Sequence, residues 1–185
     1  MRKRFFLKTL SALTLGCVWT ALAHAQAFPS KPIRLVCPFP PAGAVDIASR
    51  AIAAELTKNL GVSVTVDNKP GAGGNIGGGE VARAASDGYT ILMTTSGIQA
   101  INPALYAKMP FDTVKDLMPI AALVSLNNVL VVHPAVKANS VSEFIALGKN
   151  SPVSVASSGN GTSIHMSAEM FKHLTSFQMT HIPYK

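Results

Sequence analysis

The sequence predicts an α/β fold built on parallel strands, and two features of the chain carry this prediction. Short apolar runs alternate with segments of helical periodicity at regular spacing, which is the pattern of successive strand–helix units. The runs are continuously apolar, as expected for strands that helices cover on both faces. The order of the elements therefore predicts a parallel sheet with a helical layer on each side.

Three strands and two helices are expected in the first half of the chain. The strands are expected at Ile33–Cys37, Val62–Val66 and Tyr89–Met93, and the helices at Val45–Leu60 and Ile76–Ala85. The first helix has apolar residues at helical spacing, and Gly61 follows it as a stop signal. Asp87-Gly88 forms the turn that leads into the third strand.

The second half repeats the strand–helix pattern and predicts a second α/β lobe. Residues 102–115 are expected to form a loop with short helical turns. Strands are expected at Met118–Leu123, Val129–Val132 and Val153–Ala156, with helices ending near Lys149 and Leu174. Ser140 and Glu143 form a capping box before the first of these helices, and the chain enters a further strand at His181. The predicted boundaries are 26–124 for the first lobe and 125–185 for the second.

Residues 1–25 have the pattern of a secretory signal peptide. Four basic residues precede an uncharged apolar stretch, and Ala23-His24-Ala25 forms an A-x-A cleavage site. The stretch is short for a membrane span, so the mature chain is expected to be exported to the periplasm and not inserted in the membrane.

Charge and cysteine content exclude several classes of function. The chain has 16 Lys and Arg and 9 Asp and Glu, a net charge of +7. The signal segment holds four of the basic residues, so the mature chain keeps 12 basic and 9 acidic residues, a net charge of +3. These bases are scattered, so no nucleic-acid surface is expected. Cys37 alone survives cleavage and is expected to be a small buried hydrophobe. No metal-ligand spacing and no cofactor motif occurs.

Three loops follow expected strands at positions where α/β proteins bind ligands. In the first, Phe39, Pro41, Ala42, Gly43 and Asp46 are the candidate ligand-binding residues. Helix amino ends present free N–H groups that suit carboxylates. The alternative is a plain turn in which Asp46 caps the helix, and the pattern leaves both open.

The second loop contributes Ser158, Gly159, Gly161 and Thr162, and the third Thr95 and Ser96. An ordinary helix cap at Thr162 or Ser163 is the alternative for the second loop. His165 lies in the following helical turn, where packing is the commoner role. The topology places all three loops at one predicted cleft.

Two other interpretations have less support in the sequence. The segment Gly71–Gly77 fails the dinucleotide pattern because Ile76 stands where the last glycine belongs. It is expected to be a tight turn with close helix–sheet packing. No nucleophile elbow or Ser/His/Asp set is supported, so no catalytic residue is assigned and the chain is not expected to be an enzyme.

Together these segments resemble a known family. Residues 29–185 look like the solute receptors of tripartite tricarboxylate transporters, the Bug-type periplasmic receptors. The matching segments are Pro29–Val36, Pro38–Gly43 with Asp46, Asp67–Gly77, Ser86–Thr90, Asn102-Pro103 with Leu105-Tyr106, Lys115-Asp116, Ser158–Gly161 with His165, and His181–Lys185.

The resemblance implies a periplasmic-binding-protein-like (type II) fold of two lobes that close on a ligand. It also implies capture of a small carboxylate, such as a di- or tricarboxylate, an acidic amino acid or an aromatic acid. The implied partners are the membrane permease subunits, and the receptor is expected to be a monomer. A periplasmic sensor for a signalling system, or an α/β enzyme, is the alternative.

The chain departs from the family pattern in two ways. The first loop commonly reads P-P-G-G, whereas Ala42 stands at the third position, where a methyl group narrows the loop or alters its backbone angles. Family members are also roughly twice as long. The chain is therefore expected to be a fragment that is incomplete at the C-terminus of the fold, with exposed apolar surface and weak or absent binding.

Overall fold

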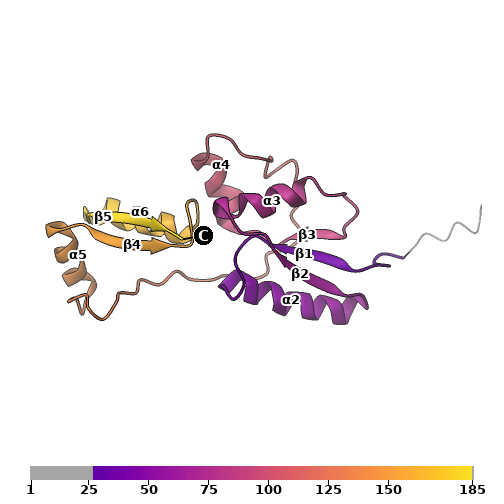
Figure 1. Ribbon diagram of the computed structural model, residues 1–185, viewed down its shortest axis with the longest axis horizontal. Coiled ribbons are helices and arrows are strands. Elements are labelled where there is room, and N and C mark those ends of the chain that lie inside the picture. Colours follow the sequence, from indigo (N-terminus) through magenta and orange to yellow (C-terminus); the bar gives the residue numbers. More distant parts are fainter. Residues whose placement is uncertain (1–26, 185) are drawn as a thin grey trace, which may run out of the picture. The chain divides into compact units, whose positions relative to one another are not determined.

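The computed structural model describes residues 27–184 (Figure 1). Contacts divide the chain into two units, Met1–Ser30 and Lys31–Lys185. Every helix and strand of the described residues belongs to the second unit. The predicted signal peptide, residues 1–25, lies outside the described residues.

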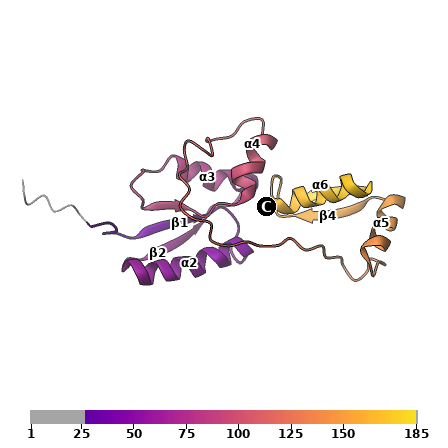
Figure 2. The same ribbon diagram turned by 180° about the vertical axis from the view of Figure 1, so that it is seen from behind.

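The first lobe contains a three-stranded parallel sheet in the order β2-β1-β3. The strands are β1 (Ile33–Cys37), β2 (Val64–Asn68) and β3 (Thr90–Leu92). Helices α2 (Ala44–Leu60) and α3 (Asn75–Ala82) contact the sheet, and they cover opposite faces of it (Figures 1 and 2). The predicted parallel α/β sheet is confirmed, although α3 ends three residues earlier than expected.

The core of this lobe forms between the sheet and α2. Ile33, Leu35 and Val64 from the strands pack with Ala53 of the helix and with Met93. Partly buried apolar residues of α2 complete it at helical spacing. Cys37 is fully buried with a free thiol, so its predicted role as a small hydrophobe is confirmed.

The ends of α2 follow from its sequence. Gly61 adopts the left-handed conformation at φ 70°, and its N–H donates to Thr57 O at 3.1 Å. This is the glycine stop that the sequence predicts. At the other end the helix begins after Gly43, whose backbone is extended.

The second lobe alternates helices and strands as predicted. Its elements are α5 (Val141–Asn150), β4 (Val153–Ser157), α6 (Ser163–Thr175) and β5 (Met179–Pro183). The two strands pair in parallel, with Val155 opposite His181. Phe177 is 2% exposed, and its ring centroid lies 4.8 Å from that of Phe144, in a tilted arrangement, and 5.3 Å from that of Phe171, edge to face.

The predicted capping box at the start of α5 forms in one of its two bonds, and the second bond is made one residue earlier than in the standard motif. Ser140 Oγ accepts a hydrogen bond from the Glu143 backbone N–H at 3.2 Å. The Glu143 carboxylate reaches back and accepts the N–H of Asn139 at 2.7 Å. The N–H of Glu143 is one of the amides that a bare helix end leaves without an acceptor, whereas Asn139 lies one residue before the N-cap Ser140.

Two predicted strands do not form. After the π-helical turn η2 (Gly97–Ile101) and the short helix α4 (Asn102–Leu105), no residue from 106 to 133 is in a strand. The predictions for Met118–Leu123 and Val129–Val132 are therefore wrong. A strand requires a hydrogen-bonded neighbour, and neither segment pairs with a described strand. Their apolar side chains are exposed, with Ile120 at 81% and Val131 at 80%.

The described helices are too short or too polar for a membrane span. None of them presents an apolar stretch of the length and hydropathy that crossing a bilayer requires.

Candidate functional site

The first candidate loop joins the carboxyl end of β1 to the amino end of α2. Gly43 is the N-cap of α2, and no side chain caps the helix there. Within the described residues, the N–H groups of Ala44 and Val45 donate no hydrogen bond. Pro41, Ala42 and Gly43 are exposed. The helix therefore offers free amides and its positive dipole end to solvent.

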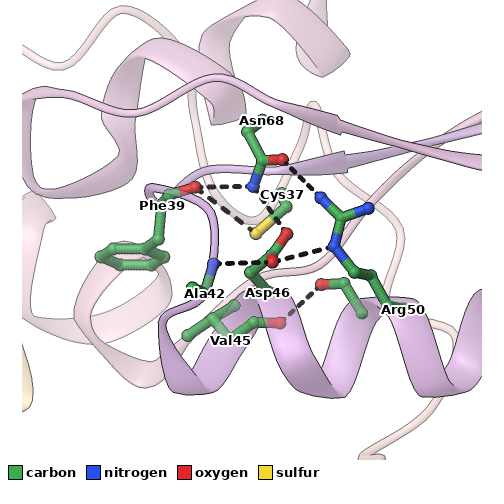
Figure 3. A network of polar contacts seen from close by, with 8 residues as sticks. Cys37, Phe39, Ala42, Val45, Asp46, Arg50 and Asn68 are labelled. Carbon is green, nitrogen blue, oxygen red and sulfur yellow. Dashed lines mark hydrogen bonds and ion pairs between the residues drawn. The ribbon is translucent and has the colours of Figure 1, made fainter.

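The Asp46 carboxylate organises this loop from inside (Figure 3). Its Oδ2 accepts the backbone N–H of Ala42 and the Nε–H of Arg50, both at 2.9 Å. Its Oδ1 accepts the amide of Asn68 at 2.9 Å. That amide also donates to Phe39 O at 2.9 Å. A single buried carboxylate thus ties the loop to α2 and to the end of β2.

These contacts keep the carboxylate ionised. The Arg50 guanidinium, the Asn68 amide and the Ala42 N–H hold the pKa of Asp46 far below its usual range. Asp46 is 2% exposed. Asp46 therefore braces the loop before α2 through the N–H of Ala42, and it does not cap the helix itself.

Ala42 adopts a backbone conformation that glycine favours. Its φ is 65°, in the left-handed region that costs an L-residue with a Cβ about 1–2 kcal/mol. The N–H of Ala42 points to Asp46, and this bond helps to hold the residue in the left-handed conformation.

The second candidate loop joins β4 to α6. Thr162 is the N-cap of α6, because its Oγ1 accepts the N–H of His165 at 3.3 Å. The same hydroxyl donates to Gly159 O at 2.8 Å. Gly159 and Gly161 take left-handed values of φ, 115° and 80°, which only glycine adopts without strain. Of the two predicted caps, Thr162 is the one that forms.

The glycine-rich segment packs as closely as the sequence predicts. Gly73 and Gly74 have φ values of 61° and 94°. A Cβ on Gly77 would lie 3.0 Å from the Pro38 side chain. The segment is thus a tight turn pressed against the end of β1.

This segment also contacts the second lobe. A Cβ on Gly73 would lie 2.3 Å from Asn160 O, and one on Gly97 would lie 2.7 Å from Gly161 O. The hydroxyl of Tyr106 donates to Asn160 O at 3.3 Å. We call these residues, together with Asn102, the interlobe contact: Gly73, Gly97, Asn102 and Tyr106 of the first lobe against Asn160 and Gly161 of the second.

The structure brings together two of the three candidate loops. The third loop, with Thr95 half-buried and Ser96 exposed, adjoins Gly161 and Thr162 of the second through Gly97. Two hollows lie beside the interlobe contact. One, of about 360 Å³, is lined by Leu105, Tyr106, Asn160 and His165, and the other is lined by residues between Ala72 and Pro110. Neither includes a residue of the first loop.

Sequence reasoning missed Asn102 and Tyr106 as parts of this region. Both lie at the short helix α4, in a stretch that was predicted to be a loop with helical turns and that carries part of the family resemblance, but to which no site residue was assigned. No local pattern distinguishes a buried asparagine whose partners are 27 and 29 residues away.

His165 belongs to a stacked histidine pair. Its ring lies 4.1 Å from that of His181, at 12° to it. His181 Nε2 and Ser157 Oγ are 2.6 Å apart. Burial, followed by the neighbouring His181, lowers the pKa of His165, while Glu169 opposes the shift. A neutral imidazole next to the second loop fits a packing and hydrogen-bonding role.

Among the described residues, no group of three or more His, Cys, Asp and Glu is placed to hold a metal ion. Arg34 forms ion pairs with Asp67 at 2.7 Å and with Glu80. These pairs tie β1 to β2 and α3 and need no ion.

A sequence profile described as the tripartite tricarboxylate transporter family receptor matches residues 48–185. The chain belongs to this receptor family. BugT of Bordetella pertussis is 37% identical over 168 residues, which cover 89% of this chain and 52% of that protein. A UPF0065 protein of Pseudomonas sp. strain P51 is 35% identical and covers 94% of this chain and 52% of its own length.

Solved structures of family receptors have the same fold. R. palustris Rpa4515 with adipate is 34% identical with a TM-score of 0.83, covering 85% of this chain and 54% of that chain. MatC of Rhodopseudomonas palustris with bound malate is 30% identical with a TM-score of 0.78, with the same coverage. The periplasmic binding protein BugD is 31% identical with a TM-score of 0.74. The chain spans about half the length of the receptors it matches, and its periplasmic-binding-protein-like fold follows from these likenesses.

Proposed function

We propose that this chain serves in the periplasm as a receptor that captures a small carboxylate and delivers it to the permease subunits of a tripartite tricarboxylate transporter. The receptor binds as a monomer and breaks no bond, so it requires no catalytic residue or cofactor. Ligand contacts made in both lobes stabilise the closed form.

One observation carries the proposal: the start of α2 has free amides, and the one nearby carboxylate is already engaged. Asp46 accepts three hydrogen bonds from the protein, so its charge is compensated and does not repel an anion strongly. The amides of Ala44 and Val45 donate to no other described residue. A ligand carboxylate can accept these N–H groups at the positive end of the helix dipole.

The second loop differs from the first in its exposure and its hydrogen bonds. Ser158 is exposed, whereas Gly159, Gly161 and Thr162 are buried and their N–H groups donate within the loop and to His165. We infer that this loop holds the ligand together with Phe39, Pro41, Ala42 and Gly43, while Thr95 and Ser96 complete the wall. Because Gly97 adjoins Gly161 and Thr162, the third loop is already in place beside the second.

Small dicarboxylates are the ligand class to test first. The related structures contain adipate and malate, and both molecules end in carboxylates that suit helix amino ends. Isothermal titration calorimetry with adipate, malate and ATP measures binding directly. Binding of a dicarboxylate without binding of ATP supports the proposal, and binding of ATP alone contradicts it.

Two glycine variants at opposite ends of α2 separate binding from folding. A Cβ on Gly43 would meet only Pro40 O at 3.5 Å, and its φ of −77° suits any residue. We expect Gly43→Ala to keep its melting temperature and to lose at least about tenfold in affinity, since the methyl obstructs approach to the amides. Gly61→Ala, whose φ is 70°, should lose stability without losing affinity.

Because the chain spans about half the length of BugT, the binding experiment also includes a longer, hybrid chain. A hybrid that continues from Lys185 into the corresponding remainder of BugT has the length of the matched receptors. If neither the chain nor the hybrid binds any small carboxylate, the proposal is wrong. If the hybrid alone binds, and Gly43→Ala weakens its binding, the loops described here are part of the site.

A further inference from the structure

The second of the two hollows described above is lined only by residues of the first lobe, and two of them carry positive charge. Its volume is about 270 Å³. Arg83, the residue at which α3 ends, lines one part of it, and Lys108, shortly after α4, lines another. No aspartate or glutamate of the described residues lines it. We call this site the basic hollow.

Neither positive charge is neutralised within the described part of the chain. The side chains of Arg83 and Lys108 form no ion pair there, whereas the guanidinium groups of Arg34 and Arg50 are paired with carboxylates. Glu80, the acidic residue nearest to Arg83 along the chain, is engaged by Arg34. Two uncompensated charges therefore line one small volume, and both attract an anion placed in it.

The guanidinium of Arg83 lies against a buried glycine of α3. A Cβ on Gly79 would lie 3.2 Å from Arg83 Nη1 and 3.4 Å from Pro110 Cγ. Because Gly79 has no side chain, the guanidinium has room to lie back along the helix beside Pro110, which also lines the basic hollow. Packing of this kind restricts the arginine before any ligand binds, so less conformational entropy is lost on binding.

The segment that carries Lys108 is packed against α3. Met109 Sδ accepts a hydrogen bond from Asn75 Nδ2 at 3.4 Å. Phe111 is 7% exposed, and its ring covers Gly78, where a Cβ would lie 2.6 Å from Cζ. These contacts hold together the two segments that supply the charges, so the basic hollow is part of the packed structure of the lobe.

Asn75 adds a buried hydrogen-bond donor to the same wall. It lines the basic hollow and is 3% exposed. Its Oδ1 accepts the amide of Asn102 at 2.7 Å, which fixes the orientation of the side chain. In the described part of the chain its Nδ2 has only the thioether of Met109 as acceptor, and sulfur accepts weakly. Buried donors are rarely left without a good acceptor, so this amide is able to donate to a ligand oxygen.

We propose that the basic hollow binds a small tetrahedral dianion, of the kind that sulfate and phosphate represent, through Arg83, Lys108 and the amide of Asn75. A guanidinium donates through a planar fork that matches the oxygens of such anions, and an ammonium adds a compact charge. Two positive charges on one small volume suit two negative charges on one compact group. Since no carboxylate lines the hollow to accept the proton of hydrogen phosphate, sulfate binds at least as tightly as phosphate.

This site is separate from the carboxylate site proposed above. None of the residues that line the basic hollow belongs to the three candidate loops. A dianion bound there joins the end of α3 to the segment that follows α4, and it stabilises the first lobe through the linkage between binding and folding.

Binding is measured on the whole 185-residue chain. Sodium sulfate is added to ¹⁵N-labelled protein while sodium chloride is reduced to keep the ionic strength constant, because screening alters every exposed charge. We expect the backbone amides of Arg83 and Lys108 and the side-chain amide of Asn75 to shift and to saturate together. Phosphate is added in a parallel titration, in which the same resonances should saturate at an equal or higher concentration.

Three variants with the same loss of charge identify the binding groups. Arg83→Gln and Lys108→Gln should each weaken sulfate binding at least about fivefold, since each removes a charge-assisted hydrogen bond. Lys58→Gln removes an exposed lysine from the last turn of α2, and its sulfate affinity should equal that of the unmodified chain.

Any of three results overturns the proposal. The Arg83, Lys108 and Asn75 resonances stay fixed, or they drift without saturation, or Lys58→Gln weakens binding as much as Lys108→Gln does. The amides of Gly43 to Val45, which report the proposed carboxylate site, are followed in the same spectra. Because the titration contains no carboxylate ligand, failure of the proposed function leaves its outcome unaffected.

Discussion

The backbone N–H of Ala42 lies 2.9 Å from Asp46 Oδ2, which binds the loop before α2 to the third residue of that helix. Arg50 and Asn68 donate to the same carboxylate. The shape of the first loop is therefore set by one ionised side chain that is buried beneath it. Its free amides depend on this arrangement, because a loop without the carboxylate has no reason to keep Ala42 in a left-handed conformation.

Replacing Asp46 with asparagine tests this dependence. Asp46→Asn keeps the volume but turns one acceptor into a donor, which then faces an N–H of Arg50, Ala42 or Asn68. We expect the melting temperature to fall by more than it does in Asp112→Asn, where an exposed aspartate caps a surface turn. Thermal unfolding followed by circular dichroism measures both. Equal losses in the two variants would show that the network does not brace the loop.

The low pKa of Asp46 determines the pH range in which this residue affects the stability of the fold. A carboxyl group whose native pKa lies below its unfolded pKa stabilises the fold above the unfolded value, which is near 4. That stabilisation is lost as the pH falls through the native pKa. Asp46 therefore contributes no change in stability between pH 7 and about 5, so a change in that range must come from another group.

Ala42→Gly should stabilise the chain. The left-handed backbone costs alanine about 1–2 kcal/mol, and the extra freedom of glycine in the unfolded chain offsets about 0.5–1 kcal/mol of the gain. We expect a net increase of about 0.5–1 kcal/mol in the free energy of unfolding, measured by urea denaturation. A loss of stability in this variant would mean that the methyl group contributes packing that its exposure does not indicate.

The sequence predicted the elements well where their signals are local. The bounds of β1 match, and α2 begins one residue earlier than expected, because proline, glycine and apolar spacing mark those ends. The predictions of strands at 118–123 and 129–132 were wrong, because a run of apolar residues does not show whether a partner strand lies beside it. The contacts of Asp46 and Asn102 join residues 22 and 29 positions apart, and spacing along the chain does not indicate such pairs.

Gly148 should resist replacement by alanine, although α5 is helical. A Cβ there would lie 2.0 Å from Cε2 of Phe177. We expect Gly148→Ala to lose about 1–3 kcal/mol from overpacking, despite the gain of about 1 kcal/mol in helix propensity.

The same substitution in a Phe177→Leu background supplies the control. The smaller side chain leaves room for the methyl group, so the cost of Gly148→Ala should fall by at least half. Urea denaturation of the two single variants and the double variant gives the coupling between the residues. An unchanged cost in the Leu background would place the strain in the backbone of α5 and not at Phe177.

The His165 ring predicts a loss of stability on acidification in a higher pH range than that of Asp46. Its native pKa is lowered, so the folded chain binds a proton less readily than the unfolded chain does. Stability contributed by the neutral ring is present above about pH 6.5 and is lost as the pH falls through the lower native pKa. His165→Phe should flatten the decline in melting temperature as the pH falls below about 6.5, which circular dichroism at a series of pH values measures. An equal decline in the variant would contradict this.

Identifying the backbone amides whose resonances shift when a carboxylate ligand is added tests the proposed receptor function most directly. The ¹⁵N–¹H spectrum of the chain, and of its full-length hybrid with BugT, is recorded while adipate or malate is added. We predict that the largest shifts, saturating together, occur at Gly43 to Val45 and at Ser158 to Thr162. Saturable binding that leaves both of these segments unmoved, while other amides shift, would contradict it.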